Sequence, residues 1–165
     1  MIKHNQALTF DISTLMDVGT GTRELYSFEG PVSFDDINVK SNIKGKMEIM
    51  RLEEGVNARM ENVEIVVGLQ CTKCLKEFNQ KIKIDNEERI FLFDPPPKQD
   101  DPNDVFLIDK KKQRIEVTEP LRQEIILHFP SIPVCYTSCK GIEHKCSINE
   151  EEEYKPLAAL KDLLK

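Results

Sequence analysis

The chain has 165 residues, of which 32% are charged and 39% hydrophobic, and a formal net charge of −6. This length is enough to bury a sizeable core, so one domain can fold without disulfide staples. An acidic surface repels a phosphate backbone, which excludes nucleic-acid binding driven by overall charge and restricts any RNA contact to a local basic patch.

Two features of the chain concern its location. It contains no apolar run long enough to span a bilayer, and residues 1–6 lack the basic and apolar regions of a signal peptide. We therefore expect a cytoplasmic protein with no membrane partner. A reducing cytoplasm disfavours disulfides, so the five cysteines are expected to be metal ligands, reactive groups or core residues.

Residues 1–93 have the pattern expected of the β-rich part of a single domain. Apolar residues alternate along residues 63–69, which is the period of a half-buried strand, and the turn signal Glu53-Glu54-Gly55 predicts a hairpin leading into it. The expected strands are residues 8–12, 25–28, 46–50, 63–69 and 81–85, with a loop at 17–21. These elements predict an α+β fold on an antiparallel β meander or a partly closed barrel.

Residues 94–104 are rich in proline and aspartate. They predict a surface loop, because proline removes a hydrogen-bond donor and aspartate favours solvent. Residues 105–165 are expected to hold a strand at 105–108, a helix, a second cysteine cluster and a short C-terminal helix with an apolar stripe over 157–164.

The start of the first of these helices is marked by Thr118-Glu119-Pro120. A hydroxyl cap, an acid in the first turn and a proline whose missing N–H is not needed there predict a helix N-terminus. The side chains expected to face the sheet are Leu121, Ile125 and either Leu127 or Phe129.

Cysteines occur in two groups. Cys71 and Cys74 form a C-x2-C pair at the expected hairpin tip, and Cys135, Cys139 and Cys146 follow about sixty residues later. Two thiolates on one tight turn can bind an ion whose tetrahedral shell is completed by a second pair. A redox dithiol, which needs a helix N-terminus, and a pair of unliganded core cysteines are the alternatives.

Several segments, taken in order, resemble the YceD family of bacterial and plastid proteins, the large ribosomal RNA subunit accumulation proteins. The matching segments are Cys71-Thr72-Lys73-Cys74-Leu75 with Phe78, residues 125–130, residues 135–141 and residues 156–163. The resemblance implies a cytosolic, non-enzymatic factor that supports processing or accumulation of large-subunit ribosomal RNA. Its partner would be precursor ribosomal RNA or a basic ribosomal protein, with no small-molecule substrate.

The second cluster departs from the pattern of many relatives. Glu143 stands where they have a cysteine, and an acidic run at 150–153 replaces a later cysteine pair. The remaining complete set is Cys71, Cys74, Cys135 and Cys139, which we expect to bind one structural zinc ion. Cys146 or His144 is the alternative ligand for either of the last two.

Two groups of lysines are candidates for contact with RNA or another partner. The knuckle group is Lys73, Lys76, Lys81 and Lys83, and the second group is Lys110, Lys111 and Lys112. Phe78 can stack on a base or pack in the core. The alternative is that these lysines are an ordinary solvated strand face and a charged turn.

Catalytic motifs are absent from the sequence, which contains no H-E-x-x-H, no G-x-S-x-G and no phosphate-binding glycine loop. We therefore expect no enzymatic activity. A zinc-stabilised protein-interaction adaptor that acts outside ribosome assembly is the alternative function.

Overall fold

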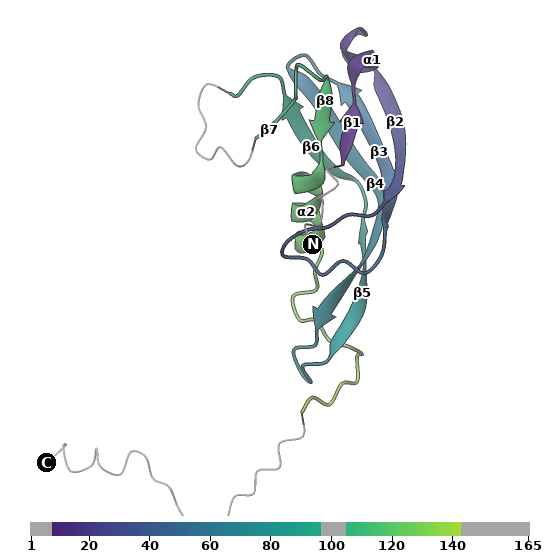
Figure 1. Ribbon diagram of the computed structural model, residues 1–165, viewed down its shortest axis with the longest axis vertical. Coiled ribbons are helices and arrows are strands. Elements are labelled where there is room, and N and C mark those ends of the chain that lie inside the picture. Colours follow the sequence, from purple (N-terminus) through teal and green to yellow (C-terminus); the bar gives the residue numbers. More distant parts are fainter. Residues whose placement is uncertain (1–7, 97–104, 143–165) are drawn as a thin grey trace, which may run out of the picture.

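The computed structural model describes residues 8–96 and 105–142 (Figure 1). Its main element is a six-stranded sheet in the order β2-β3-β4-β6-β7, with β5 also paired to β4. The strands are β2 (Arg23–Gly30), β3 (Ile43–Arg51), β4 (Gly55–Gln70), β5 (Glu77–Ile84), β6 (Glu87–Leu92) and β7 (Phe106–Leu107). All pairs in this sheet are antiparallel except β6 with β7.

Strand β4 organises the sheet because its 16 residues pair with different strands along its length. Its first part lies between β3 and β6, and its second part pairs with β5. The register with β3 shifts between Lys44 and Lys46, and Asn62 opposite has a φ of 50°. Such a β-bulge bends a strand. The β4–β5 hairpin therefore extends from one end of the elongated molecule (Figure 1).

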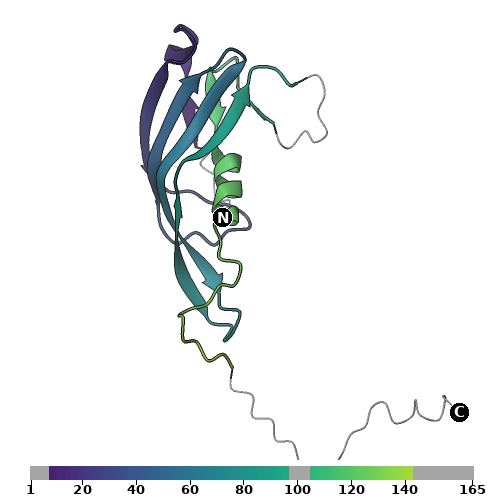
Figure 2. The same ribbon diagram turned by 180° about the vertical axis from the view of Figure 1, so that it is seen from behind.

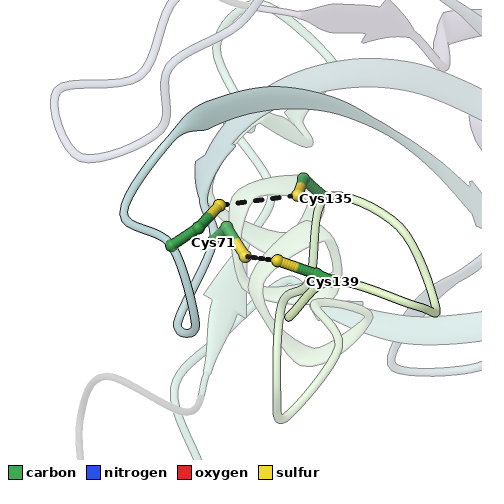
Figure 3. Close-up of side chains that lie close together, drawn as sticks. Cys71, Cys135 and Cys139 are labelled. Atoms are coloured by element: carbon green, nitrogen blue, oxygen red, sulfur yellow. Dashed lines mark hydrogen bonds between the residues drawn. The ribbon is translucent and has the colours of Figure 1, made fainter. Parts of the chain in front are cut away.

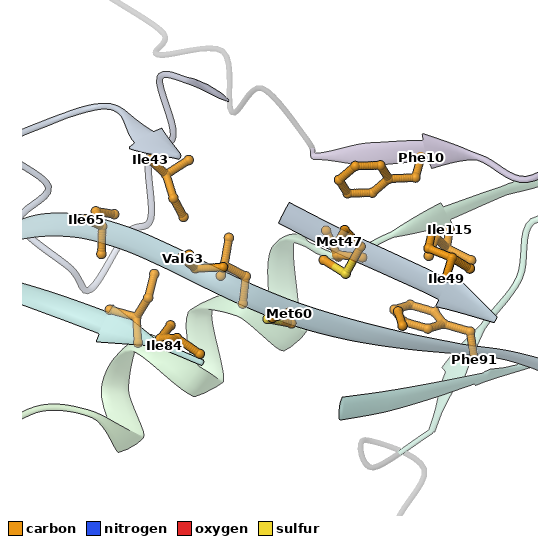
Figure 4. Packing of buried hydrophobic residues seen from close by; sticks show 14 of the residues in the cluster. Phe10, Ile43, Met47, Ile49, Met60, Val63, Ile65, Ile84, Phe91 and Ile115 are labelled. Carbon is orange, nitrogen blue, oxygen red and sulfur yellow. The ribbon is translucent and has the colours of Figure 1, made fainter. Parts of the chain in front are cut away.

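A second layer covers one face of the sheet. It consists of β1 (Thr9–Asp11), α1 (Ser13–Met16), β8 (Arg114–Glu116) and α2 (Thr118–Leu127), with β1 and β8 paired antiparallel. Figure 2 shows α2 and β8 behind the main strands. The apolar core lies between the layers, and its fully buried members include Ile12, Leu15, Ile43, Met47, Ile49, Met60, Ile65, Ile84, Phe91, Ile115, Leu121 and Ile125 (Figure 4).

Helix α2 begins at the predicted residue, but Thr118 does not cap it. Val117 is the N-cap and makes no side-chain cap hydrogen bond. The Thr118 hydroxyl instead accepts a hydrogen bond of 2.9 Å from the Leu8 N–H, which ties the start of the helix to β1. Of the two alternatives for the inward face, Phe129 packs against the core and Leu127 is exposed.

The six segments expected to be strands all contain strand, and the chain has mostly β-structure with two helices among its described residues. The meander holds from β2 to β5, but the partly closed barrel is wrong. Strand β6 pairs back onto β4 and joins β7 in parallel, so the sheet stays open. The expected C-terminal helix and most of the 94–104 loop lie outside the described residues.

No helix in the described ranges has the length and apolarity needed to cross a membrane.

A buried ion pair that the periodicity did not predict joins α2 to β6. Glu124 is 1% exposed on the inward face of α2, and the Arg89 guanidinium donates a hydrogen bond to its carboxylate. Arg89 keeps 27% of its side-chain exposure, so water reaches the cation and not the anion. Removing the Arg89 cation should therefore destabilise the fold more than removing the Glu124 carboxylate, because the loss of Arg89 leaves a fully buried negative charge unpaired.

Replacing Arg89 by methionine should lower the free energy of unfolding by about 3–5 kcal/mol. Glu124→Met should have a smaller effect, because Arg89 can regain water. The double variant should recover most of the loss, since it leaves no unpaired charge. Urea denaturation of the three variants measures this order, and an Arg89→Met protein as stable as the unmutated one would contradict it.

Candidate metal centre

The first half of the centre is the tight turn between β4 and β5. The Cys71 N–H donates to the Lys76 carbonyl at 2.9 Å, and the Leu75 N–H donates back to the Cys71 carbonyl at 2.9 Å. Leu75 has a φ of 61°, a left-handed conformation that is unusual for a bulky side chain. This turn brings the sulfurs of Cys71 and Cys74 to one side, as the C-x2-C spacing predicted.

The second half is the segment that follows α2. Both the N–H and the hydroxyl of Thr72 donate to the Pro133 carbonyl, at 2.9 and 3.1 Å. A Cβ at Gly141 would lie 3.1 Å from the Lys73 carbonyl oxygen, and Gly141 has a φ of 81°. Residues 133–142 therefore contact the turn that carries Cys71 and Cys74, here called the knuckle, near both ends of the segment.

The four predicted cysteines come together in this structure. Their sulfurs all lie within 4.8 Å of one another. Cys71 Sγ is 3.9 Å from Cys139 Sγ, and Cys74 Sγ is 3.6 Å from Cys135 Sγ (Figure 3). A tetrahedral zinc ion with Zn–S bonds of about 2.3 Å separates its sulfurs by about 3.8 Å. The donor set and its spacing therefore fit zinc.

The pKa values of two of these thiols are shifted in opposite directions. Burial raises the pKa of Cys71, but amide hydrogen bonds from Cys135, Cys74 and Lys73 outweigh it and lower the pKa to about 6. Burial and the neighbouring cysteine side chains raise the pKa of Cys135 to about 12. Without a cation the cluster therefore cannot ionise fully, because thiolates at these distances repel one another. A divalent cation would relieve that repulsion.

Two alternatives for these cysteines were a redox dithiol and a metal site completed by His144 or Cys146. Cys71 follows a strand and precedes a turn, so among the described residues it is not at the helix N-terminus that a thioredoxin-like dithiol uses. His144 and Cys146, the alternative ligands, lie outside the described residues.

The lysines of the knuckle group occupy two different environments. Lys81 and Lys83 lie 2.8 and 3.5 Å from Glu64, which Lys44 also approaches to 3.2 Å. Hydrogen bonds from Lys81 and Lys44 lower the pKa of Glu64 to about 2. Lys73 and Lys76 are exposed and have no ion-pair partner within the described ranges. Their positive charge is therefore the less compensated.

The second lysine group lies at the opposite end of the molecule. Its turn is held to α1 by a hydrogen bond from the Ile12 N–H to the Gln113 carbonyl. Lys110 pairs with Asp94 at 2.6 Å and Lys112 with Asp109 at 3.7 Å. The two groups therefore cannot form one continuous surface (Figure 1).

A cavity beside the cysteines was not predicted. It has a volume of about 610 Å³ and is lined by Cys74, Lys76, Tyr136, Ser138, Cys139, Lys140, Gly141 and Ile142. Tyr136 and Ile142 are 58% and 49% exposed. The sequence feature that could have indicated this cavity is the aromatic residue Tyr136, which directly follows Cys135. Phe78 is half-buried opposite Leu69, on the same side of β5 as the buried Ile82 and Ile84.

Comparison with known families gives one match. A family model described as "Large ribosomal RNA subunit accumulation protein YceD" matches residues 61–164. This range includes the second part of β4, all of β5 and α2, and all four cysteines of the centre. No curated protein and no solved structure matches the chain.

Protein purified without chelator should contain about one zinc ion per chain. Cys74→Ser should lose it, because three thiolates and an alcohol bind zinc more weakly, whereas Cys146→Ser should keep it. Elemental analysis of the three proteins measures the stoichiometry. Clearly substoichiometric zinc in the unmutated protein, or loss of zinc from Cys146→Ser alone, would contradict the assigned ligand set.

Zinc affinity should increase with pH. Cys135 carries a proton at every pH below about 12 in the metal-free centre, so zinc must displace it. Each displaced proton makes the apparent affinity rise about tenfold per pH unit. Below pH 6 the Cys71 thiolate also becomes protonated, which steepens the loss. Competition with a chromophoric chelator at pH 5.5, 7 and 8 tests this, and a pH-independent affinity would refute it.

Proposed function

The chain belongs to the YceD family of large ribosomal RNA subunit accumulation proteins, and from this membership we propose that it is a non-catalytic factor supporting processing or accumulation of large-subunit ribosomal RNA. The observation that carries the proposal is the family match over residues 61–164. That range contains the whole cysteine centre, so family membership and the candidate site concern the same part of the chain.

The centre has a structural role in this proposal. Four protein thiolates complete a tetrahedral zinc shell and leave no position for a substrate or a water molecule. Zinc would hold residues 133–142 against the β4–β5 turn, where Thr72 already binds the Pro133 carbonyl. The ion thus supports a surface and takes no part in chemistry.

We place the partner surface at the knuckle end of the molecule. Lys73 and Lys76 have no ion-pair partner there among the described residues, and Lys81 and Lys83, which both lie close to Glu64, extend the group of lysines along β5. Precursor ribosomal RNA would complement these cations, whereas a basic ribosomal protein, the other expected partner, would be attracted by the net charge of −6 of the whole chain. The Lys110–Lys112 turn would be a separate and weaker contact, because two of its lysines are paired with aspartates.

The adaptor function is the second candidate, and one observation favours it. Leu75 and Ile132, on the knuckle and on the following segment, are 56% and 68% exposed. Apolar side chains that form a contiguous exposed patch mark protein contacts, and the hydrogen bond from Thr72 to Pro133 brings the segments of Leu75 and Ile132 together. In that case the zinc centre would present an apolar surface to a protein outside ribosome assembly.

Depletion of the protein in the organism that encodes it should lower the amount of large subunits relative to small subunits and increase large-subunit RNA precursors. The unmutated gene should restore both, and Cys74→Ser should not, because the loss of zinc releases the partner surface. Sucrose-gradient sedimentation with quantification of precursor RNA measures the effect. Normal subunit ratios and precursor levels after depletion would exclude the proposed function and favour the adaptor.

A further inference from the structure

The cavity beside the cysteine centre has a composition that the proposed structural role of zinc does not require. Its lining combines an exposed tyrosine with a serine, Ser138, and two lysines, Lys76 and Lys140. Its volume of about 610 Å³ falls within the range of sites that bind small ligands or parts of larger ones. Two of its lining residues, Cys74 and Cys139, belong to the metal centre itself.

Two residues of the cavity lining, Lys76 and Lys140, carry a positive charge. Lys76 and Lys140 are exposed, and neither has an ion-pair partner in the part of the chain that the structure describes. The whole chain has a net charge of −6. With zinc bound, the four thiolates would outweigh the charge of the ion, so Lys76 and Lys140 are the groups of this cavity that can contact an anionic part of a ligand.

The exposed ring determines which anionic ligand fits best. Tyr136 is 58% exposed beside the two lysines, although an aromatic side chain usually buries much of its surface. Bases of unpaired RNA stack on aromatic side chains while lysines contact the adjacent phosphates. A duplex keeps its bases stacked internally, and its recognition needs a cationic surface across successive grooves. The open side of the sheet near β5 has Glu64 among its lysines, so it lacks such a surface.

We propose that this cavity binds an unpaired nucleotide of single-stranded RNA, with its base stacked on Tyr136 and the flanking phosphates on Lys76 and Lys140. The inference rests on the proposed function and names the RNA contact within it. Ser138 lines the same cavity, and in this proposal its hydroxyl is available to a base edge or a ribose hydroxyl. Because Cys74 and Cys139 line the same cavity, the metal centre fixes the spacing between Lys76 and the segment containing Tyr136 and Lys140.

The test measures binding of the full-length, zinc-loaded protein to a fluorescein-labelled 12-nucleotide oligouridine by fluorescence anisotropy. Tyr136→Ala should weaken binding about 5- to 150-fold, which is the usual effect of removing one stacking platform. Tyr136→Phe should bind like the unmutated protein, because the ring is retained. Zinc content measured for each variant shows that the neighbouring centre is intact.

Salt dependence tests the lysines separately. Lys76→Ala and Lys140→Ala should each reduce the slope of log affinity against log salt concentration by about 0.7. Lys46→Ala, an exposed lysine of β3 on the open face of the sheet, removes the same charge and should leave the slope unchanged. A 12-base-pair RNA duplex should bind more weakly than the single strand.

Any of four results would overturn the inference, three of them obtained with variants or with the duplex. These three are a Tyr136→Ala affinity within twofold of the unmutated protein, equal losses of slope for Lys46→Ala and Lys76→Ala, and a duplex that binds as tightly as the single strand. An unmutated protein that binds no oligouridine would overturn it too. In each case the effect of depletion on subunit ratios decides the proposed function independently, because that measurement does not depend on direct RNA contact.

Discussion

The convergence of four cysteine side chains from two distant segments determines the structure of one end of this molecule. Beyond α2 the described chain forms no further helix or strand, and it is positioned by the Thr72 contacts to Pro133 and by the cysteines themselves. Thiols at these separations resist joint ionisation, as the raised pKa of Cys135 indicates. A cation that prefers sulfur ligands would bind the four thiolates and remove that repulsion, which is why we propose zinc for this centre.

The rest of the fold is independent of this centre. The apolar core lies between the main sheet and the layer formed by β1, β8 and α2, and the Arg89–Glu124 pair fixes α2 to β6 within it. The bulge at Asn62 bends β4, whose second part still contributes Val63, Ile65 and Val67 to that core before the β4–β5 turn carries Cys71 and Cys74 to one end of the molecule. Loss of metal should therefore disturb the knuckle end and leave the sheet folded.

Local patterns predicted the parts of the structure that depend on local rules. Apolar patterns predicted six of the eight described strands but neither β6 nor β8. The Thr118-Glu119-Pro120 sequence predicted the start of α2, although the Thr118 hydroxyl accepts its hydrogen bond from the distant Leu8 N–H. The pairing of β6 with β4 was harder to predict from the sequence, because Phe91 is the only fully buried apolar residue of β6. The inward Arg89 of this strand pairs with Glu124, which lies on a helix distant in the sequence. The four-cysteine set followed from spacing and resemblance, while the cavity around Tyr136 requires knowledge of how two segments lie together.

We propose that the function of the protein lies in the surface that the zinc centre supports. The centre itself would be closed to substrates, because four thiolates fill its coordination shell. Zinc K-edge X-ray absorption of the full-length protein tests this claim most directly, since it reports the ligands of the bound ion. We predict a shell of about four sulfur atoms at about 2.3 Å with no lighter ligand. A shell that includes a nitrogen or oxygen atom, from His144 or from water, would contradict the closed four-thiolate centre.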